Sequence, residues 1–215
     1  MENQNEINKF YQKRLKETGS FYQLRASQMA RFRSMTRHLN FKGKDVLDIG
    51  CGTGDFLFHL SSVDQWPRSY IGIDVLEEAL ETAKERFDGM RNVNFYQTKN
   101  YLEEKWVEAD IVVGIGLFAL KFLKDERKNC QLVMRWFEKM FSECREACGA
   151  TFLSVYKWEI RDGEAVFKPD RVFEWLKPRV ERLLVDHSYA PHVFTVIGVK
   201  GETPWHREVK LEKKI

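Results

Sequence analysis

The residues best suited to chemistry lie in one short run, VLDIGCGTGDF at Val46 to Phe56. Gly50, Gly52 and Gly54 occupy alternate positions there, directly after an apolar stretch that is typical of a buried strand. Glycine adopts positive backbone φ angles without strain and leaves room for a ligand beside the main chain. The run therefore predicts a ligand-binding loop between a strand and a helix, at the carboxyl edge of an open α/β sheet.

Two kinds of ligand compete for such a loop. A dinucleotide-binding loop has a third small residue where its helix packs, and a pyrophosphate meets the helix N-terminus. Asp55 occupies that place in this chain, and its carboxylate would oppose a pyrophosphate. The Lys-Ser/Thr pair of a P-loop is absent. A nucleoside joined to an amino acid fits the loop better, and Asp48 suits an ammonium group or an ordered water near it.

Asp74 ends a second apolar stretch, in the run IGIDVLEEAL. A carboxylate at that point can accept hydrogen bonds from both hydroxyls of a ribose. NAD enzymes use the same device, so Asp74 alone does not choose between cofactors, and it could also cap the helix that follows. Val75 and Leu76 would then flank an adenine.

These segments resemble the class I S-adenosylmethionine-dependent methyltransferases. The resemblance rests on VLDIGCGTGDF, YIGIDVLEEAL and VNFYQTKNYLEEKWVEADIVVGIGLF, which cover about half of the chain. The whole chain is also similar to a little-characterised bacterial branch of that family, through FYQKRLKETG, QMARF and YAPHVFT. The resemblance implies S-adenosylmethionine as the cofactor and the following binding residues: Arg31, Asp48, Gly50, Cys51, Gly52, Gly54, Asp74, Val75, Asn100, Tyr101 and Gly116.

For two of these residues, a role other than cofactor binding is equally well supported. The family usually has Asp where this chain has Asn100, whose amide could meet the adenine N6 or N1 or could simply form a turn. Arg31 could reach the methionine carboxylate, as N-terminal helix residues do in related enzymes, or could be solvated. Tyr11 and Gln28 are possible contacts of the same kind.

His192 is the best candidate for a general base, because a histidine titrates near neutral pH. Tyr189 beside it is the second catalytic candidate, and Tyr156 and Trp158 could line an acceptor pocket. The alternative is that His192 belongs to a turn and the aromatic residues to the core. The apolar run GIGLFAL at Gly114 to Leu120 lacks the Asn/Asp-Pro-Pro-Tyr/Phe motif of amide and adenine methylation, so it more plausibly lines the adenine or an apolar acceptor.

Composition limits the class of protein. The chain has 215 residues and a net charge of +3, although residues 1–45 carry ten Lys and Arg against four Asp and Glu. The polar N-terminus is no signal peptide, and no apolar run approaches the roughly 20 residues that span a bilayer. The four cysteines show no zinc spacing, so no metal site is predicted; Cys144 and Cys148 would lie one turn apart in a helix. A cytoplasmic protein is expected.

Strand and helix patterns alternate from Asp45 onward. They predict a Rossmann-like α/β fold: a doubly wound, seven-stranded, mostly parallel sheet that ends in an antiparallel hairpin. The predicted domains are an N-terminal helical lid at 1–44, a methyltransferase domain at 45–200 and a polar tail at 201–215. The expected strands are 45–49, 69–73, 93–97, 109–115, 150–156, 180–186 and 193–200. The expected helices are 4–17, 21–39, 56–61, 126–147 and 169–176, with another that follows the second strand and runs through residue 87.

The resulting functional prediction is methyl transfer to a small-molecule acceptor by in-line displacement. Methylation of RNA or a protein, guided by the basic N-terminal region, is one alternative. A methyltransferase-fold binding protein without catalysis is the other. No membrane partner is expected, nucleic acid is not favoured, and the sequence does not indicate an oligomeric state.

Overall fold

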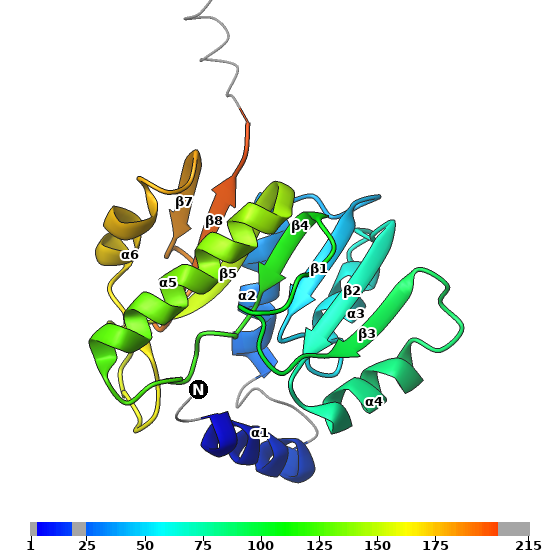
Figure 1. Ribbon diagram of the computed structural model, residues 1–215, viewed down its shortest axis with the longest axis horizontal. Coiled ribbons are helices and arrows are strands. Elements are labelled where there is room, and N and C mark those ends of the chain that lie inside the picture. Colours follow the sequence, from blue (N-terminus) through cyan, green and yellow to red (C-terminus); the bar gives the residue numbers. More distant parts are fainter. Residues whose placement is uncertain (1–3, 19–24, 202–215) are drawn as a thin grey trace, which may run out of the picture.

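A computed structural model describes residues 4–18 and 25–201 of the chain (Figure 1). The predicted tail at 201–215 lies outside these residues apart from Gly201. The strands are β1 Asp45–Ile49, β2 Ser69–Asp74, β3 Val93–Gln97, β4 Ala109–Gly114, β5 Cys144–Ser154, β6 Val166–Phe167, β7 Arg182–Asp186 and β8 Val193–Val199. The helices are α1 Gln4–Thr18, α2 Arg25–His38, α3 Asp55–Ser62, α4 Glu77–Arg86, α5 Glu126–Glu143 and α6 Pro169–Leu176.

The strands form one sheet with the order β3-β2-β1-β4-β5-β8-β7. β1 to β5 run parallel to one another, β8 pairs antiparallel with β5, and β7 and β8 form the antiparallel hairpin that the sequence predicts. The short β6 pairs with β5 outside this path, so the sheet has eight strands where seven were expected. The Rossmann-like fold is otherwise confirmed.

Two hydrophobic cores cover the two faces of the sheet. Leu47 and Ile49 of β1 belong to the core beneath α5 and α6, whereas Val46 belongs to the core beneath α2, α3 and α4. Successive side chains of a strand point to opposite faces, so a central parallel strand needs apolar residues on both. β4 is buried along its whole length for the same reason.

The junction between α5 and β5 differs from the prediction. The helix ends at Glu143 instead of continuing to residue 147, and the strand begins at Cys144 instead of residue 150. Cys144 and Cys148 are therefore strand residues, not neighbours on a helix. Gly149 does not end a helix either: it lies in the strand, where a Cβ would come 2.5 Å from Met35 Sδ of α2. Pairing of β5 with both β4 and β8 overrides the helical pattern of this segment.

α2 packs on the sheet as part of the second core, through Phe32 and Met35. Its Ser34 and His38 reach Asp186 at the end of β7, at 3.2 and 2.8 Å. α1 lies across the lower end of the molecule in Figure 1, and its Ile7 belongs to the core beneath α5 and α6. No helix among the described residues is both long and apolar enough to cross a membrane.

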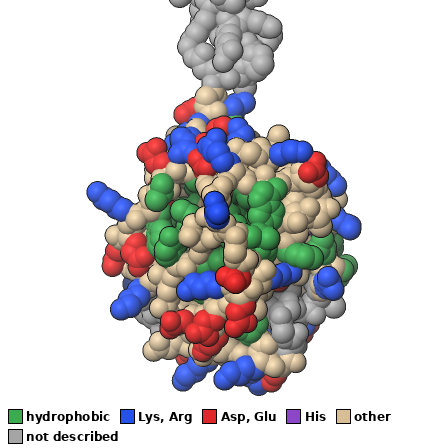
Figure 2. Space-filling model, turned by 90° about the vertical axis from the view of Figure 1, so that its right-hand side faces the viewer, with side chains coloured by type: hydrophobic (Ala, Val, Ile, Leu, Met, Phe, Trp, Pro, Cys, Tyr) green, Lys and Arg blue, Asp and Glu red, His purple; other side chains and the backbone are tan. Residues whose placement is uncertain are grey.

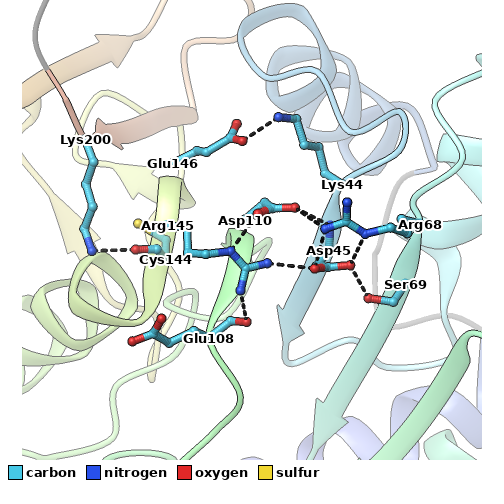
Figure 3. A network of polar contacts seen from close by, with 10 residues as sticks. All are labelled: Lys44, Asp45, Arg68, Ser69, Glu108, Asp110, Cys144, Arg145, Glu146 and Lys200. Atoms are coloured by element: carbon cyan, nitrogen blue, oxygen red, sulfur yellow. Dashed lines mark hydrogen bonds and ion pairs between the residues drawn. The ribbon is translucent and has the colours of Figure 1, made fainter.

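Ion pairs hold the amino ends of the central strands together (Figure 3). Asp45 accepts hydrogen bonds from Arg68 and Arg145 at 2.6 and 2.7 Å, and Arg145 also donates to Asp110 at 2.7 Å. The hydrogen bond from Arg68 is the largest of the influences that hold the pKa of Asp45 well below its usual range. These charges are satisfied within the fold, which leaves ligand binding to the opposite, carboxyl edge of the sheet.

β3 forms one outer edge of the sheet, and Figure 2 turns that side of the molecule toward the viewer. Hydrophobic side chains gather near the middle of this view, with Lys, Arg, Asp and Glu side chains around them. Tyr96 of β3 and Met90 just before it are among the exposed hydrophobic residues of the chain.

Candidate cofactor and acceptor site

The predicted glycine loop joins β1 to α3. Gly50, Gly52 and Gly54 all have positive φ angles, of 74°, 54° and 75°. The amides of Gly50 and Cys51 donate to the carbonyl of Ile73 at 2.8 and 3.1 Å, which fixes the loop against the end of β2. A Cβ on Gly54 would lie 2.7 Å from the ring of Phe87, so this glycine lets the start of α3 approach the residue that follows α4.

A cavity of about 580 Å³ opens beside this loop, within the usual size range of small-molecule sites. Its walls come from several parts of the chain: α1, α2, the glycine loop, the segments after β2, β3, β4 and β5, and the turn before β8. The predicted site residues that line it are Arg31, Asp48, Gly50, Cys51, Gly52, Asp74, Val75, Tyr101, Gly116 and His192. Gly54, Asn100 and Tyr189 do not line it.

Asp74 faces the cavity from the end of β2. Its Oδ2 accepts the amide of Gly52 at 2.9 Å, and its Oδ1 accepts the amide of Leu76 at 3.0 Å. Each carboxylate oxygen has two lone pairs, so both oxygens keep the capacity to accept a ribose hydroxyl. Burial raises the pKa of Asp74, and the backbone donors, which favour the carboxylate, oppose that shift.

Asp48, near the end of β1, lines the cavity and is almost fully buried. Burial raises its pKa to about 7, although the hydroxyl of Tyr70 donates to Oδ2 and favours the carboxylate. The charge of Asp74 contributes a smaller increase. A cation that reached Asp48 would therefore stabilise the ionised form.

The loop after β3 does not present Asn100 to the cavity. The Oδ1 of Asn100 accepts a hydrogen bond from the amide of Leu102 at 3.2 Å. Asn100 therefore has the second of its two predicted roles, that of a turn residue. Thr98, Lys99 and Tyr101 line the cavity in its place. Tyr101 is buried, and its hydroxyl donates to Glu143 of α5 at 2.7 Å.

Sequence reasoning missed the residue that shapes this loop, Glu104. Its carboxylate accepts the hydroxyl of Thr98 at 3.0 Å and the amides of Lys99 and Asn100 at 2.9 and 3.2 Å. One acid thus fixes three successive residues. A Glu in a polar loop carries no signal that distinguishes this role from an exposed charge.

α2 brings four residues to the cavity: Ser27, Gln28, Arg31 and Phe32. Arg31 and Gln28 are buried rather than solvated, and Gln28 Nε2 donates to Asp55 at 2.8 Å. Asp55 also accepts from Arg86 of α4 at 2.7 Å. Asp55, the first residue of α3, therefore links α2 and α4 to the beginning of α3 through hydrogen bonds.

His192 lines the cavity from the turn before β8. Its Nε2 lies 2.8 Å from the hydroxyl of Ser27, and its ring stacks against Trp158 with centroids 6.5 Å apart. Burial lowers the pKa of His192, and the nearby charges of Arg31 and Lys157 lower it further. The imidazole is therefore neutral at pH 7 and able to accept a proton.

Tyr189 lies in a buried network rather than in the cavity. Its hydroxyl is 2.9 Å from Thr195 Oγ1, which accepts from Ser34 of α2 at 2.8 Å. Burial raises the pKa of Tyr189 to about 12. The network joins α2 to the hairpin and so supports the two elements that carry Ser27 and His192.

A group of apolar side chains lines the cavity away from the glycine loop, as the sequence run at 114–120 predicted for part of it, and Arg14 and the charged residues of 157–164 line it as well. Two loops are joined there: Lys121 donates its amide to Gly163 at 2.8 Å, and Ala165 donates to Ala119 at 3.0 Å. The apolar residues of this wall are Ile7, Phe10, Tyr11, Ala119, Leu120, Phe122, Trp136 and Leu153. Tyr11 was named as a possible contact, whereas nothing in the sequence distinguished Trp136 from an ordinary helix-packing residue.

Comparisons with known proteins agree with this geometry. The sequence profile of a family described as a methyltransferase domain matches residues 40–196. Rv1506c of Mycobacterium tuberculosis, a candidate methyltransferase, is 26% identical over 159 residues, which are 73% of this chain and 93% of that protein.

Two solved structures share the fold. The DhpI–SAH complex has a TM-score of 0.66 at 17% identity and covers 93% of this chain and 95% of its own. Magnesium protoporphyrin IX methyltransferase (ChlM) from Synechocystis PCC 6803, with bound SAM, has a TM-score of 0.64 at 12% identity and covers 94% and 98%.

Proposed function

The chain belongs to the methyltransferase-domain family, and we propose that it transfers a methyl group from S-adenosylmethionine to a small molecule held in the same cavity. The observation that carries the proposal is the continuity of this cavity. It joins the glycine loop and Asp74 to His192 and the apolar wall, so cofactor and acceptor can meet without leaving the protein.

The residues present fit the cofactor. Asp74 has acceptor capacity for both ribose hydroxyls, and the loop at Gly50 and Gly52 leaves the main chain open to the methionine portion. Asp48 would receive the ammonium group, and Arg31 the carboxylate. The adenine would lie between Val75 and the loop of Lys99 and Tyr101, whereas Gly54 supports the helix and Asn100 the turn.

When bound, S-adenosylmethionine supplies a methyl group made electrophilic by the sulfonium charge. With the cofactor held by Asp48, Asp74 and the glycine loop, the acceptor atom would bond to the methyl carbon as the sulfur–carbon bond breaks, and the bonding electron pair would remain on sulfur. If the acceptor carries a proton, Ser27 accepts it while donating its own proton to Nε2 of His192, which later releases it to solvent. Most of the protein's contribution is alignment and exclusion of water.

The proposed acceptor is small because the apolar wall is enclosed by two loops that are hydrogen-bonded to each other. Within the proposed lid at 1–44, α1 covers the cavity with Ile7, Phe10 and Tyr11, and Gln12 bonds to Glu78 of α4 at 2.9 Å. The four cysteines are free, which suits a reducing compartment, so we place the enzyme in the cytoplasm.

Transfer of a radiolabelled methyl group from S-adenosylmethionine into fractionated cell extract tests this proposal. We expect the label in the small-molecule fraction, and at least about a hundredfold slower labelling with the His192→Ala protein. Label in protein or RNA would replace the small-molecule acceptor by a macromolecule. Tight cofactor binding with no label in any fraction would instead support a binding protein without catalysis.

A further inference from the structure

Trp158 is the most exposed large hydrophobic side chain among the described residues, with 87% of its surface accessible. It follows β5, lines the cavity, and stacks against His192 with an interplanar angle of 28°. A single exposed apolar side chain is ordinary, but an indole left uncovered beside the proposed base offers a recognition surface. Most of the indole surface remains available to a second partner.

We propose that the acceptor is a neutral, planar aromatic molecule with an ionisable hydroxyl group, and that Trp158 is its recognition residue. This inference rests on the proposed function, because it assigns the substrate class of the same cavity.

The wall of the cavity supports a planar aromatic acceptor. Phe10 and Tyr11 meet edge to face with ring centroids 5.4 Å apart, and Phe122 and Trp136 stack at 5.1 Å. All four rings line the cavity together with Trp158. Aromatic rings pack on one another in offset and edge-on arrangements that give more stabilisation than apolar area alone.

The charges beside Trp158 support a neutral acceptor. Lys157 forms an ion pair with Glu164, and Arg161 pairs with Glu159 at 3.5 Å. These four charges therefore compensate one another, and Asp162 adds a negative charge to the same loop. An anionic acceptor would meet the charge of Asp162 and compete with existing ion pairs, whereas a neutral ring needs no new ion pair.

The hydroxyl follows from the position of the proton relay. Ser27, His192 and Trp158 all line the cavity, and the centroids of the indole and imidazole rings are 6.5 Å apart, so a ring that packs on the edge of the indole can place a substituent near the relay. The hydroxyl oxygen attacks the methyl carbon, its proton passes through Ser27 to His192, and the electron pair of the broken bond stays on sulfur. The products are an aryl methyl ether and S-adenosylhomocysteine.

Two probes with one carbon skeleton test the inference: 2-naphthol, which is planar and aromatic, and decahydro-2-naphthol, which is saturated. Their affinities are measured by calorimetry with protein saturated with S-adenosylhomocysteine, so that no reaction occurs. We expect 2-naphthol to bind about three- to tenfold more tightly, which matches the usual gain from aromatic pairing. Trp158→Ala should abolish this preference, and Trp158→Phe should keep most of it. Ile160→Ala is the matched control, because Ile160 is exposed in the same loop but does not line the cavity.

Equal binding of the two probes, no binding of 2-naphthol, or an unchanged preference in Trp158→Ala would overturn the inference. A separate titration of the free protein with S-adenosylhomocysteine keeps the two proposals apart. If the cofactor product binds and the aromatic preference is absent, the substrate class is wrong and the proposed methyl transfer stands. If the cofactor product does not bind, the proposed function fails as well.

Discussion

The hydroxyl of Ser27 lies 2.8 Å from Nε2 of His192, although the two residues are 165 positions apart in the chain. The contact joins α2 to the turn between β7 and β8. It places a hydroxyl and an imidazole side by side in the wall of the cavity. The N-terminal helices thus help to complete the proposed site rather than merely precede it.

Replacement of His192 by Ala should lower the rate of methyl transfer by about 10²- to 10⁴-fold, because the proton acceptor is lost. In the wild-type protein, the pKa of His192 is lowered from its usual 6.5. With saturating S-adenosylmethionine, activity should therefore persist at neutral pH and fall only as the pH drops through a midpoint below 6.5. A pH–rate profile with label transfer as the readout measures both effects. Unchanged affinity for S-adenosylhomocysteine is the control; a rate unaffected by the substitution would remove His192 from the chemistry.

Cofactor affinity should increase with pH in the range set by Asp48. Its pKa is raised to about 7, so the ionised fraction grows from about one tenth at pH 6 to one half at pH 7. If Asp48 receives the ammonium group, the affinity for S-adenosylhomocysteine should rise about fivefold over that interval. Asp48→Asn should bind weakly at both pH values and show a flat profile. An equally steep profile in this variant would assign the titration to another group.

Gly54→Ala should lower the free energy of unfolding by about 2 kcal/mol, because a side chain is strained at a φ of 75° and would contact Phe87. Gly43→Ala is the matched control: its φ is 71°, but nothing lies within 4 Å of the added Cβ. Urea unfolding should therefore show a loss for Gly54→Ala that exceeds the control by at least about 1 kcal/mol. Equal losses would show that the ring of Phe87 moves aside at no cost.

Asp45→Asn should lower the free energy of unfolding by about 2 kcal/mol at pH 7, since it weakens charged hydrogen bonds from Arg68 and Arg145. The pKa of Asp45 is depressed in the folded protein, so its contribution is complete above the unfolded value near 4 and is lost as pH falls below it. The difference in unfolding free energy between wild type and Asp45→Asn, measured by urea unfolding, should therefore shrink as the pH falls below about 4. Asp64→Asn, at an exposed pair with Lys42, should change stability by less than about 0.5 kcal/mol at either pH.

The elements that carry strong periodic patterns were predictable. β1, β4 and the terminal hairpin follow from apolar runs and a turn, and the glycine loop follows from its three glycines between a strand and a helix. The start of β5 was wrong by six residues, because CREACGA has no strand pattern of its own. Its extended conformation depends on pairing with β4 and β8, which lie far from it in the sequence, so the local pattern does not reveal it.

The cofactor side of the site was also more predictable than the acceptor side. Asp74 and the loop at Gly50 are local motifs, whereas Ser27 and Trp136 reach the cavity only through tertiary packing. Asn100 and Tyr189 show the limit of prediction from motifs, because both have a suitable residue type but neither lines the cavity. The side-chain oxygen of Asn100 accepts a hydrogen bond within a turn, and the hydroxyl of Tyr189 belongs to a buried network. Hydrogen-bond partners of that kind are not readable from sequence spacing.

Calorimetric titration of the protein with S-adenosylhomocysteine tests the central claim most directly. We predict one site per chain with a dissociation constant in the micromolar range, and a loss of at least about tenfold in Asp74→Ala, because the acceptor of both ribose hydroxyls is removed. Glu77→Ala, an exposed acid at the start of α4, should bind as the wild type does. Absence of binding by the wild-type protein, or equal affinity in Asp74→Ala with its thermal unfolding midpoint preserved, would contradict the account.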